Sequence, residues 1–323
     1  MTVIYTPGHN LVTDTLIIHG VVKYISVLGV KNAVVERVGE RYRVEAEGVG
    51  SGRVEFVEPI VRAINVYEEY GDARLLKGTV TYKLIRGDIA MGAMGRLHVF
   101  KAGLTSLSPS WLEAFIENHH CDGKHVLPPH LSAVFNLSGE RGVCDVCFTF
   151  ANLGFLYGAT VAVMKKPGRR DVVYMVPTPR GRAAWEDVFL MQQVASLLEI
   201  SVGDVPTLAV PVVWLSWGAA MDIVDGPFDL LVWRVESIRG QLRVMDWHIL
   251  DLTKLTDVVV ELWDGTTDWP RCVKVTLYGN PHVLADLANY ATQGGDGRKV
   301  AQGLLSGKNT ARFCAGAVEV LAK

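Results

Sequence analysis

Nineteen consecutive residues, Val146 to Met164, carry no formally charged side chain, and two lysines follow them directly. A run of this length approaches what a helix needs to cross a bilayer. It also contains Asn152, Gly154 and Gly158, which favour a buried helix that ends near one of the glycines and is followed by a strand. We therefore predict that this segment lies in a protein core and does not span a membrane.

The composition supports a folded chain with a large core. Apolar residues make up 49% of the 323 residues and charged residues 20%, which excludes a disordered chain. The length suffices for two domains or one elaborate domain. Because the formal net charge is -2, contact with nucleic acid would require a local basic patch.

The predicted elements indicate an α+β fold in two parts. Residues 1–205 form a mixed α/β domain with the cysteine-rich segment and a basic hairpin, and residues 206–323 form a strand-rich segment followed by C-terminal helices. Helices are predicted at 13–28, 54–70, 110–119, 144–158, 185–199, 283–290, 298–305 and 310–321. A hairpin is predicted at 33–45, and strands are predicted at 78–85, 160–164, 172–176, 208–215, 230–235, 241–250 and 273–277.

Three of the five cysteines lie within 27 residues of one another. Cys144 and Cys147 have the spacing of two zinc ligands, and Cys121 offers a third thiolate. We predict that His120 is the fourth ligand of this structural zinc knot, and His119, His125 and His130 are alternatives. Two other interpretations stay open: the cysteines are small buried residues, or Cys144 and Cys147 are a redox dithiol.

The cysteine count also bears on the cellular setting. An odd number of cysteines and an N-terminus without the pattern of a signal peptide predict a reducing, cytoplasmic location. In that setting clustered cysteines favour a metal or chemical reactivity over disulfides.

A second candidate site is basic. Six cations occur in 18 residues with a single acid, Asp171, between them. On a hairpin the cations would follow phosphates, and the ring of Tyr174 would stack on a base. A solvated hairpin face is the alternative interpretation. The predicted nucleic-acid-binding residues are Lys165, Lys166, Arg169, Arg170, Tyr174, Arg180 and Arg182.

No catalytic residue is assigned. The chain lacks a P-loop, a dinucleotide-binding loop and a nucleophile elbow. Asp246 and His248 would share one face of a strand, whereas Asp251 would not, which argues against an acid–base triad. His9 and Asp14 are assigned to a turn and a helix start.

The segment GERGVCDVCFTFANLG, residues 139–154, resembles the Cys-x-x-Cys segment of CRISPR-associated large-subunit proteins. The opening YTPGHNLVTD, residues 5–14, is similar to the small archaeal subtype I-A version, the Csa type. The resemblance implies a subunit of the crRNA-guided Cascade complex that is not itself a nuclease. It would help to recognise the protospacer-adjacent motif and to hold opened DNA, while the guide reads the sequence. The family's metal-type cysteines correspond to Cys144 and Cys147, whereas of the second pair only Cys121 is present.

We therefore predict a non-catalytic subunit of a type I-A Cascade complex. Its partners would be other Cascade subunits, crRNA and target DNA, with no membrane, and its cofactor would be structural zinc. One alternative is a metal-dependent hydrolase or nuclease that uses the histidine-rich segment 119–130. The other alternative is an assembly protein without nucleic-acid contact.

Overall fold

The computed structural model describes residues 1–49, 115, 121, 123, 127, 129–133, 142–166, 169–195, 197–200, 205–218, 226–238, 241–307 and 310–323. The chain folds into two compact units that interleave along the sequence. Unit 1 comprises Met1–Ala159, Thr178–Leu197 and Ser237–Val244, and unit 2 comprises Thr160–Pro177, Leu198–Glu236 and Met245–Lys323. The elements predicted at 54–70, 78–85 and 110–119 lie outside the described residues. The domain boundary at residue 205 stays a prediction.

Unit 1 contains an antiparallel sheet with the strand order β1-β3-β2-β6. The predicted hairpin at 33–45 is confirmed as β2 and β3, and the turn between them contains Gly39 at a φ of 66°. A positive φ is readily adopted by glycine, which explains this residue at the turn. The strands are β1 (Thr2–Tyr5), β2 (Asn32–Val38), β3 (Arg41–Glu47) and β6 (Arg182–Ala184).

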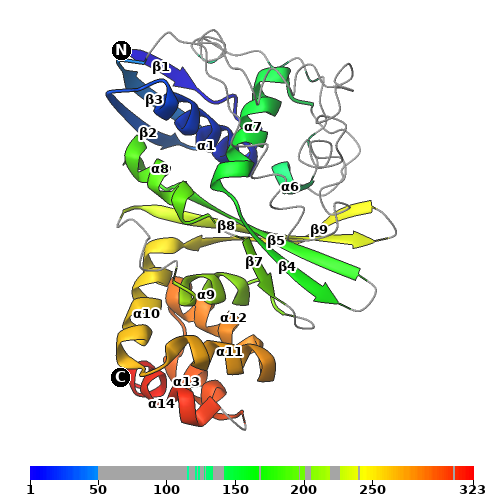
Figure 1. Ribbon diagram of the computed structural model, residues 1–323, viewed down its shortest axis with the longest axis vertical. Coiled ribbons are helices and arrows are strands. Elements are labelled where there is room, and N and C mark those ends of the chain that lie inside the picture. Colours follow the sequence, from blue (N-terminus) through cyan, green and yellow to red (C-terminus); the bar gives the residue numbers. More distant parts are fainter. Residues whose placement is uncertain are drawn as a thin grey trace. The chain divides into compact units, whose positions relative to one another are not determined.

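Two closely packed helices, α1 (Leu11–Val27) and α7 (Asp145–Gly158), form the centre of unit 1 (Figure 1). A Cβ atom at Gly154 would lie 1.7 Å from the backbone oxygen of Leu16, and one at Gly20 would lie 2.2 Å from the backbone oxygen of Phe150. The two backbones therefore approach each other at glycines that no larger residue can replace without a shift. The short helices α6 (Pro129–Ser132) and α8 (Trp185–Gln193) also pack on α1.

The uncharged run 146–164 behaves as predicted. It supplies most of α7, which ends at Gly158, and the start of strand β4 (Thr160–Lys166). Within the described ranges, no helix combines the length and the apolar character that a membrane crossing requires.

The second sheet has the order β7-β4-β5-β8-β9 and belongs largely to unit 2. The predicted strands at 160–164 and 172–176 are confirmed as the antiparallel pair β4 and β5, and those at 230–235 and 241–250 as β8 and β9. The predicted helix at 185–199 is wrong beyond α8, because a strand, β7, follows it. The bounds are β5 (Arg169–Pro179), β7 (Leu197–Ile200), β8 (Phe228–Ile238) and β9 (Gln241–Asp251).

The other described elements of unit 2 are helices (Figure 1). The three predicted C-terminal helices are confirmed, and the mixed α+β fold class with them. The helices are α9 (Ala209–Ser216), α10 (Leu252–Gly265), α11 (Trp269–Gly279), α12 (His282–Asn289), α13 (Gly297–Leu305) and α14 (Thr310–Leu321), with a π-helical turn at Tyr290–Gly294.

The strands predicted at 208–215 and 273–277 are wrong, since these residues lie in α9 and α11. All eight residues of α9 are buried, so the valine-rich composition reflects burial and not strand geometry. In α11, Cys272, Val273, Thr276 and Leu277 are buried, which is the spacing of one helical face. The side chain of Asp268 accepts a hydrogen bond from the backbone N–H of Arg271 and caps this helix.

Candidate functional sites

The structure brings a histidine and the clustered cysteines together in unit 1. One ligand atom each of His9, Cys121 and Cys147 lies within 4.8 Å of the other two. The distance between Nε2 of His9 and Sγ of Cys121 is 3.5 Å. The thiol of Cys144 also neighbours that of Cys147. We call these four residues the cysteine–histidine cluster.

Local backbone features position each member. Gly8 has a φ of 82° and turns the chain between β1 and α1, and the side chain of Asn10 accepts a hydrogen bond from the N–H of Thr13 at the start of α1. His9 is held between these two residues. Cys144 is the N-cap residue of α7, and Cys147 lies in the first turn of this helix.

The segments around Cys121 and Cys144 contact each other through their backbones. The N–H of Cys144 donates a hydrogen bond to Sγ of Cys121 at 2.7 Å. A Cβ atom at Gly142 would lie 2.0 Å from the backbone oxygen of Gly123, which itself has a φ of 71°. Glycine is therefore needed at both positions for the two segments to meet.

The electrostatics of the cluster are those of closely spaced thiols. The neighbouring thiols of Cys121 and Cys144, together with burial, raise the pKa of Cys147 well above its usual value. A bound divalent cation would lower the pKa of these thiols, because it stabilises thiolates and not thiols.

Sequence reasoning found three members of the cluster and missed His9. Residues 119, 120 and 125 lie outside the described residues, and the side chain of His130 is not described. The prediction of His120 as a ligand, and the alternative hydrolase that uses segment 119–130, therefore stay predictions. A histidine 112 residues from Cys121 gives no spacing signal, although its place in a turn before a helix was predicted.

The second candidate site is the basic hairpin, which we define as the end of the β4–β5 pair with Lys165, Lys166, Arg169 and Arg170. In the strand register Lys165 is opposite Arg170, and Lys166 is opposite Arg169. Opposite residues in an antiparallel pair share a face, with Cβ atoms about 4.5–5.5 Å apart. The hairpin therefore ends in two pairs of like-charged residues.

The acid within this basic stretch does not lie at the surface. Asp171 is 0% exposed and pairs with the guanidinium of Arg234 on β8. Tyr174 is 1% exposed, and its ring centroid lies 5.5 Å from that of Trp233. The ring of Tyr174 is thus part of the core, so the structure does not offer it for stacking on a base.

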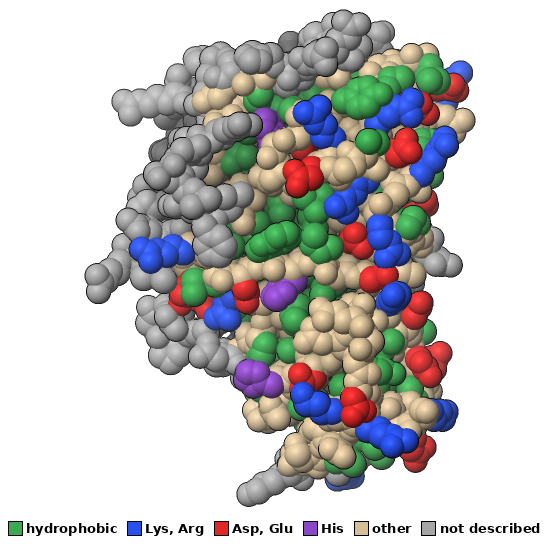
Figure 2. Space-filling model, turned by 180° about the vertical axis from the view of Figure 1, so that it is seen from behind, with side chains coloured by type: hydrophobic (Ala, Val, Ile, Leu, Met, Phe, Trp, Pro, Cys, Tyr) green, Lys and Arg blue, Asp and Glu red, His purple; other side chains and the backbone are tan. Residues whose placement is uncertain are grey.

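The remaining two predicted cations belong to unit 1. Arg180 and Arg182 are exposed and follow β5, and Arg182 is opposite Glu36 in the β2–β6 register. Figure 2 shows one face of the molecule, on which Lys and Arg side chains are interspersed with Asp and Glu. The six cations of the stretch 165–182 are therefore divided between the two units, four in unit 2 and two in unit 1.

The Asp246–His248 pair has a structural explanation. Thr207 donates a hydrogen bond to the carboxylate of Asp246 at 2.9 Å, and Nε2 of His248 lies 3.8 Å from it. Burial alone would raise the pKa of Asp246, but His248, Thr207 and the charge of Arg234 lower it below its usual value. Asp251 instead accepts a hydrogen bond from the N–H of Lys254 and caps α10.

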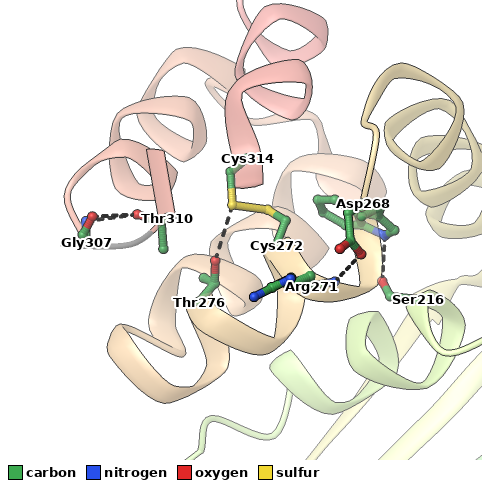
Figure 3. Close-up of a disulfide and its surroundings, with 9 residues drawn as sticks. Ser216, Asp268, Arg271, Cys272, Thr276, Gly307, Thr310 and Cys314 are labelled. Carbon is green, nitrogen blue, oxygen red and sulfur yellow. Dashed lines mark hydrogen bonds between the residues drawn. A yellow bond between two sulfur atoms is a disulfide. The ribbon is translucent and has the colours of Figure 1, made fainter. Parts of the chain in front are cut away.

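The two cysteines outside the cluster form a disulfide. Cys272 on α11 and Cys314 on α14 are both 0% exposed and are joined across 42 residues of sequence (Figure 3). The hydroxyl of Thr276 lies 3.8 Å from Sγ of Cys314. We predicted from the sequence that the cysteines favour metal binding or reactivity over disulfides. For Cys272 and Cys314 that prediction is wrong.

Comparison with known proteins gives the class of molecule to which these sites belong. The CRISPR-associated protein family Cas_Csa4 matches residues 2–106 and 132–314, which is well over half of the chain. The chain belongs to this family. It is also 26% identical over 325 residues to the CRISPR system associated protein Cas8 of Thermoproteus tenax, with 90% of this chain and 88% of the relative covered. The resemblance to CRISPR-associated large-subunit proteins is thereby confirmed.

Proposed function

We propose that this chain is a non-catalytic subunit of a crRNA-guided type I-A interference complex, a Cascade complex, that acts in the cytoplasm and contacts nucleic acid through the basic hairpin. Membership of the Cas_Csa4 family supports a role in CRISPR defence. The similarity to a Cas8 protein supports the role of a subunit in an effector complex. Recognition of the protospacer-adjacent motif and binding of opened target DNA are the finer parts of the proposal.

The observation that carries the nucleic-acid contact is the register of the basic hairpin. Like charges directly opposite each other in a sheet destabilise the strand pair, because the usual spacing of opposite residues is shorter than the Debye length of about 8 Å at physiological salt. The carboxylate of Asp171, the one acid in this basic stretch, pairs with Arg234 in the core. A polyanion along the hairpin end would remove the repulsion and gain charge-assisted contacts.

The test is a gel-shift titration with the full chain, alone and together with guide-loaded partner subunits. Duplex and single-stranded DNA are each titrated across a salt series. The variant is Lys166→Glu/Arg169→Glu. Losing two phosphate contacts should lower the slope of log K against log salt by about 1.8 for duplex and about 1.4 for single-stranded DNA.

A matched control is Arg298→Glu/Lys299→Glu, which makes the same change in net charge at exposed positions of α13. We expect this control to keep most of the affinity, because its effect is long-range and screened. Equal loss in both variants would show that only net charge matters. Unchanged binding in the hairpin variant would refute the proposed contact.

The place in the complex is tested separately. Co-purification of the tagged chain with guide RNA and the other subunits should succeed for the wild type and for both charge variants if the hairpin contacts target DNA and not the assembly. Assembly without any DNA affinity would favour the alternative of an assembly protein.

A further inference from the structure

We propose that the cysteine–histidine cluster is a structural zinc site whose histidine ligand is His9, from the loop between β1 and α1. Cys121, Cys144 and Cys147 provide the three thiolates. The site would connect the N-terminal loop to the start of α7. This inference goes beyond the proposed function, because it requires no nucleic acid and no partner subunit.

The distances fit a tetrahedral zinc ion. Bonds of about 2.3 Å to sulfur and about 2.0–2.1 Å to nitrogen imply ligand separations of about 3.6 Å between sulfur and nitrogen and about 3.8 Å between two sulfurs. The observed separation of Nε2 of His9 and Sγ of Cys121 is 3.5 Å. The ligand atoms of His9, Cys121 and Cys147 all lie within 4.8 Å of one another, so small rotamer changes would complete the tetrahedron.

The fourth ligand is supplied by the start of α7. Cys144 is the N-cap residue of this helix, but its side chain makes no capping hydrogen bond. Its thiol instead neighbours that of Cys147. The positive end of the helix dipole at this position favours thiolate over thiol.

The backbone around the cluster is already arranged for a metal. The N–H of Cys144 donates to Sγ of Cys121, which is the kind of hydrogen bond that stabilises a metal-bound thiolate. The close contact of Gly123 with Gly142 fixes the two cysteine segments against each other. This preorganisation distinguishes a ligand set from cysteines that merely share a core.

A buried carboxylate lies next to the histidine. Asp14, in the first turn of α1, is 0% exposed, and its polar neighbours include Thr6 and the backbone of His9. Neither of its oxygens makes a well-formed hydrogen bond with the described residues. Asp14 therefore lies beside the backbone of the loop that carries His9, at the start of α1.

The test measures metal on the purified full chain. We expect about one equivalent of zinc by elemental analysis. Cobalt substituted for zinc should give the intense visible bands of a tetrahedral site and near-ultraviolet bands from thiolate-to-cobalt charge transfer. His9→Ala should lower zinc affinity by more than about 100-fold in a chelator competition, since losing a ligand costs more than the 10–100-fold typical of outer-shell changes.

Two further variants identify the histidine. His282→Ala removes an exposed histidine at the start of α12 and should leave zinc affinity unchanged. His120→Ala tests the ligand predicted from sequence. Loss of zinc in His120→Ala with full affinity in His9→Ala would overturn the assignment of His9. Failure of the wild type to bind zinc or cobalt, or a disulfide between Cys144 and Cys147 in protein kept under reductant, would overturn the site itself.

Discussion

The disulfide between α11 and α14 makes a quantitative prediction about stability. Closing a loop of 42 residues removes about 13 cal/mol/K of entropy from the unfolded chain, or about 4 kcal/mol at 25 °C. The variant Cys272→Ala/Cys314→Ala should lose about this much of the free energy of unfolding. Alanine is used instead of serine because serine would place a hydroxyl at positions that are 0% exposed.

The assay is thermal unfolding followed by circular dichroism, with and without the reductant TCEP. For a unit of this size, about 4 kcal/mol corresponds to a fall in Tm of about 8–16 °C. Reduced wild-type protein should unfold at nearly the same temperature as the alanine variant, and the variant should not respond to TCEP. The variant therefore serves as its own control for effects of the reductant elsewhere, including on the cysteine–histidine cluster.

A particular result would refute this reasoning. If TCEP leaves the wild-type Tm unchanged, or if alkylation under denaturing conditions without reductant labels all five cysteines, the disulfide does not contribute to stability. Labelling of three cysteines before reduction and five after it is the expected pattern, because the three clustered cysteines form no disulfide.

Three other substitutions follow from the contacts described above. Gly154→Ala should destabilise by at least ~1–3 kcal/mol in urea unfolding, because its Cβ would meet a backbone oxygen of α1, whereas Gly279→Ala, whose Cβ has no neighbour within 4 Å, should be nearly neutral. Burial raises the pKa of Asp14 to about 7, so the native state binds this proton more tightly than the unfolded state, and stability falls as the pH rises from about 4 to 7. In metal-free protein, the advantage of Asp14→Asn over the wild type should therefore grow by at most ~4 kcal/mol between pH 4 and pH 8, and an equal difference at all pH values would contradict this. Arg234→Ala should cost ~3–5 kcal/mol because it removes a cationic partner of the buried carboxylate of Asp171, and adding Asp171→Asn should restore part of that loss.

The elements that were predicted correctly from the sequence are those with apolar residues at regular spacing or with residue types typical of a turn. The C-terminal helices have apolar residues at helical spacing, and the β4–β5 pair flanks a Pro-Gly dipeptide at residues 167–168. The Cys-x-x-Cys segment begins a helix, as predicted. In each case the local signal agrees with the tertiary structure.

The two wrong strand predictions share a cause. Residues 208–215 and 273–277 are rich in valine, and β-branched residues favour strands only weakly when burial decides the conformation. Pro211 was the overlooked signal, because proline is poorly tolerated in a central strand but is accepted in the first turn of a helix, where it lies in α9. At α11, Asp268 and Pro270 similarly mark a helix start.

The fourth member of the cysteine–histidine cluster could not be found from spacing, because the tertiary structure brings His9 to the cysteines. A Cβ atom at Gly154 would meet the backbone of Leu16, and one at Gly20 would meet the backbone of Phe150, so the α1 and α7 backbones approach each other at glycines. His9 lies just before α1 and Cys147 lies in the first turn of α7, and their ligand atoms are within 4.8 Å of each other. Gly154 and Gly158, which argued against a membrane span, are thus residues that let α7 approach α1 closely. In this structure the tertiary fold, and not the order of residues along the chain, makes His9 a neighbour of the cysteines.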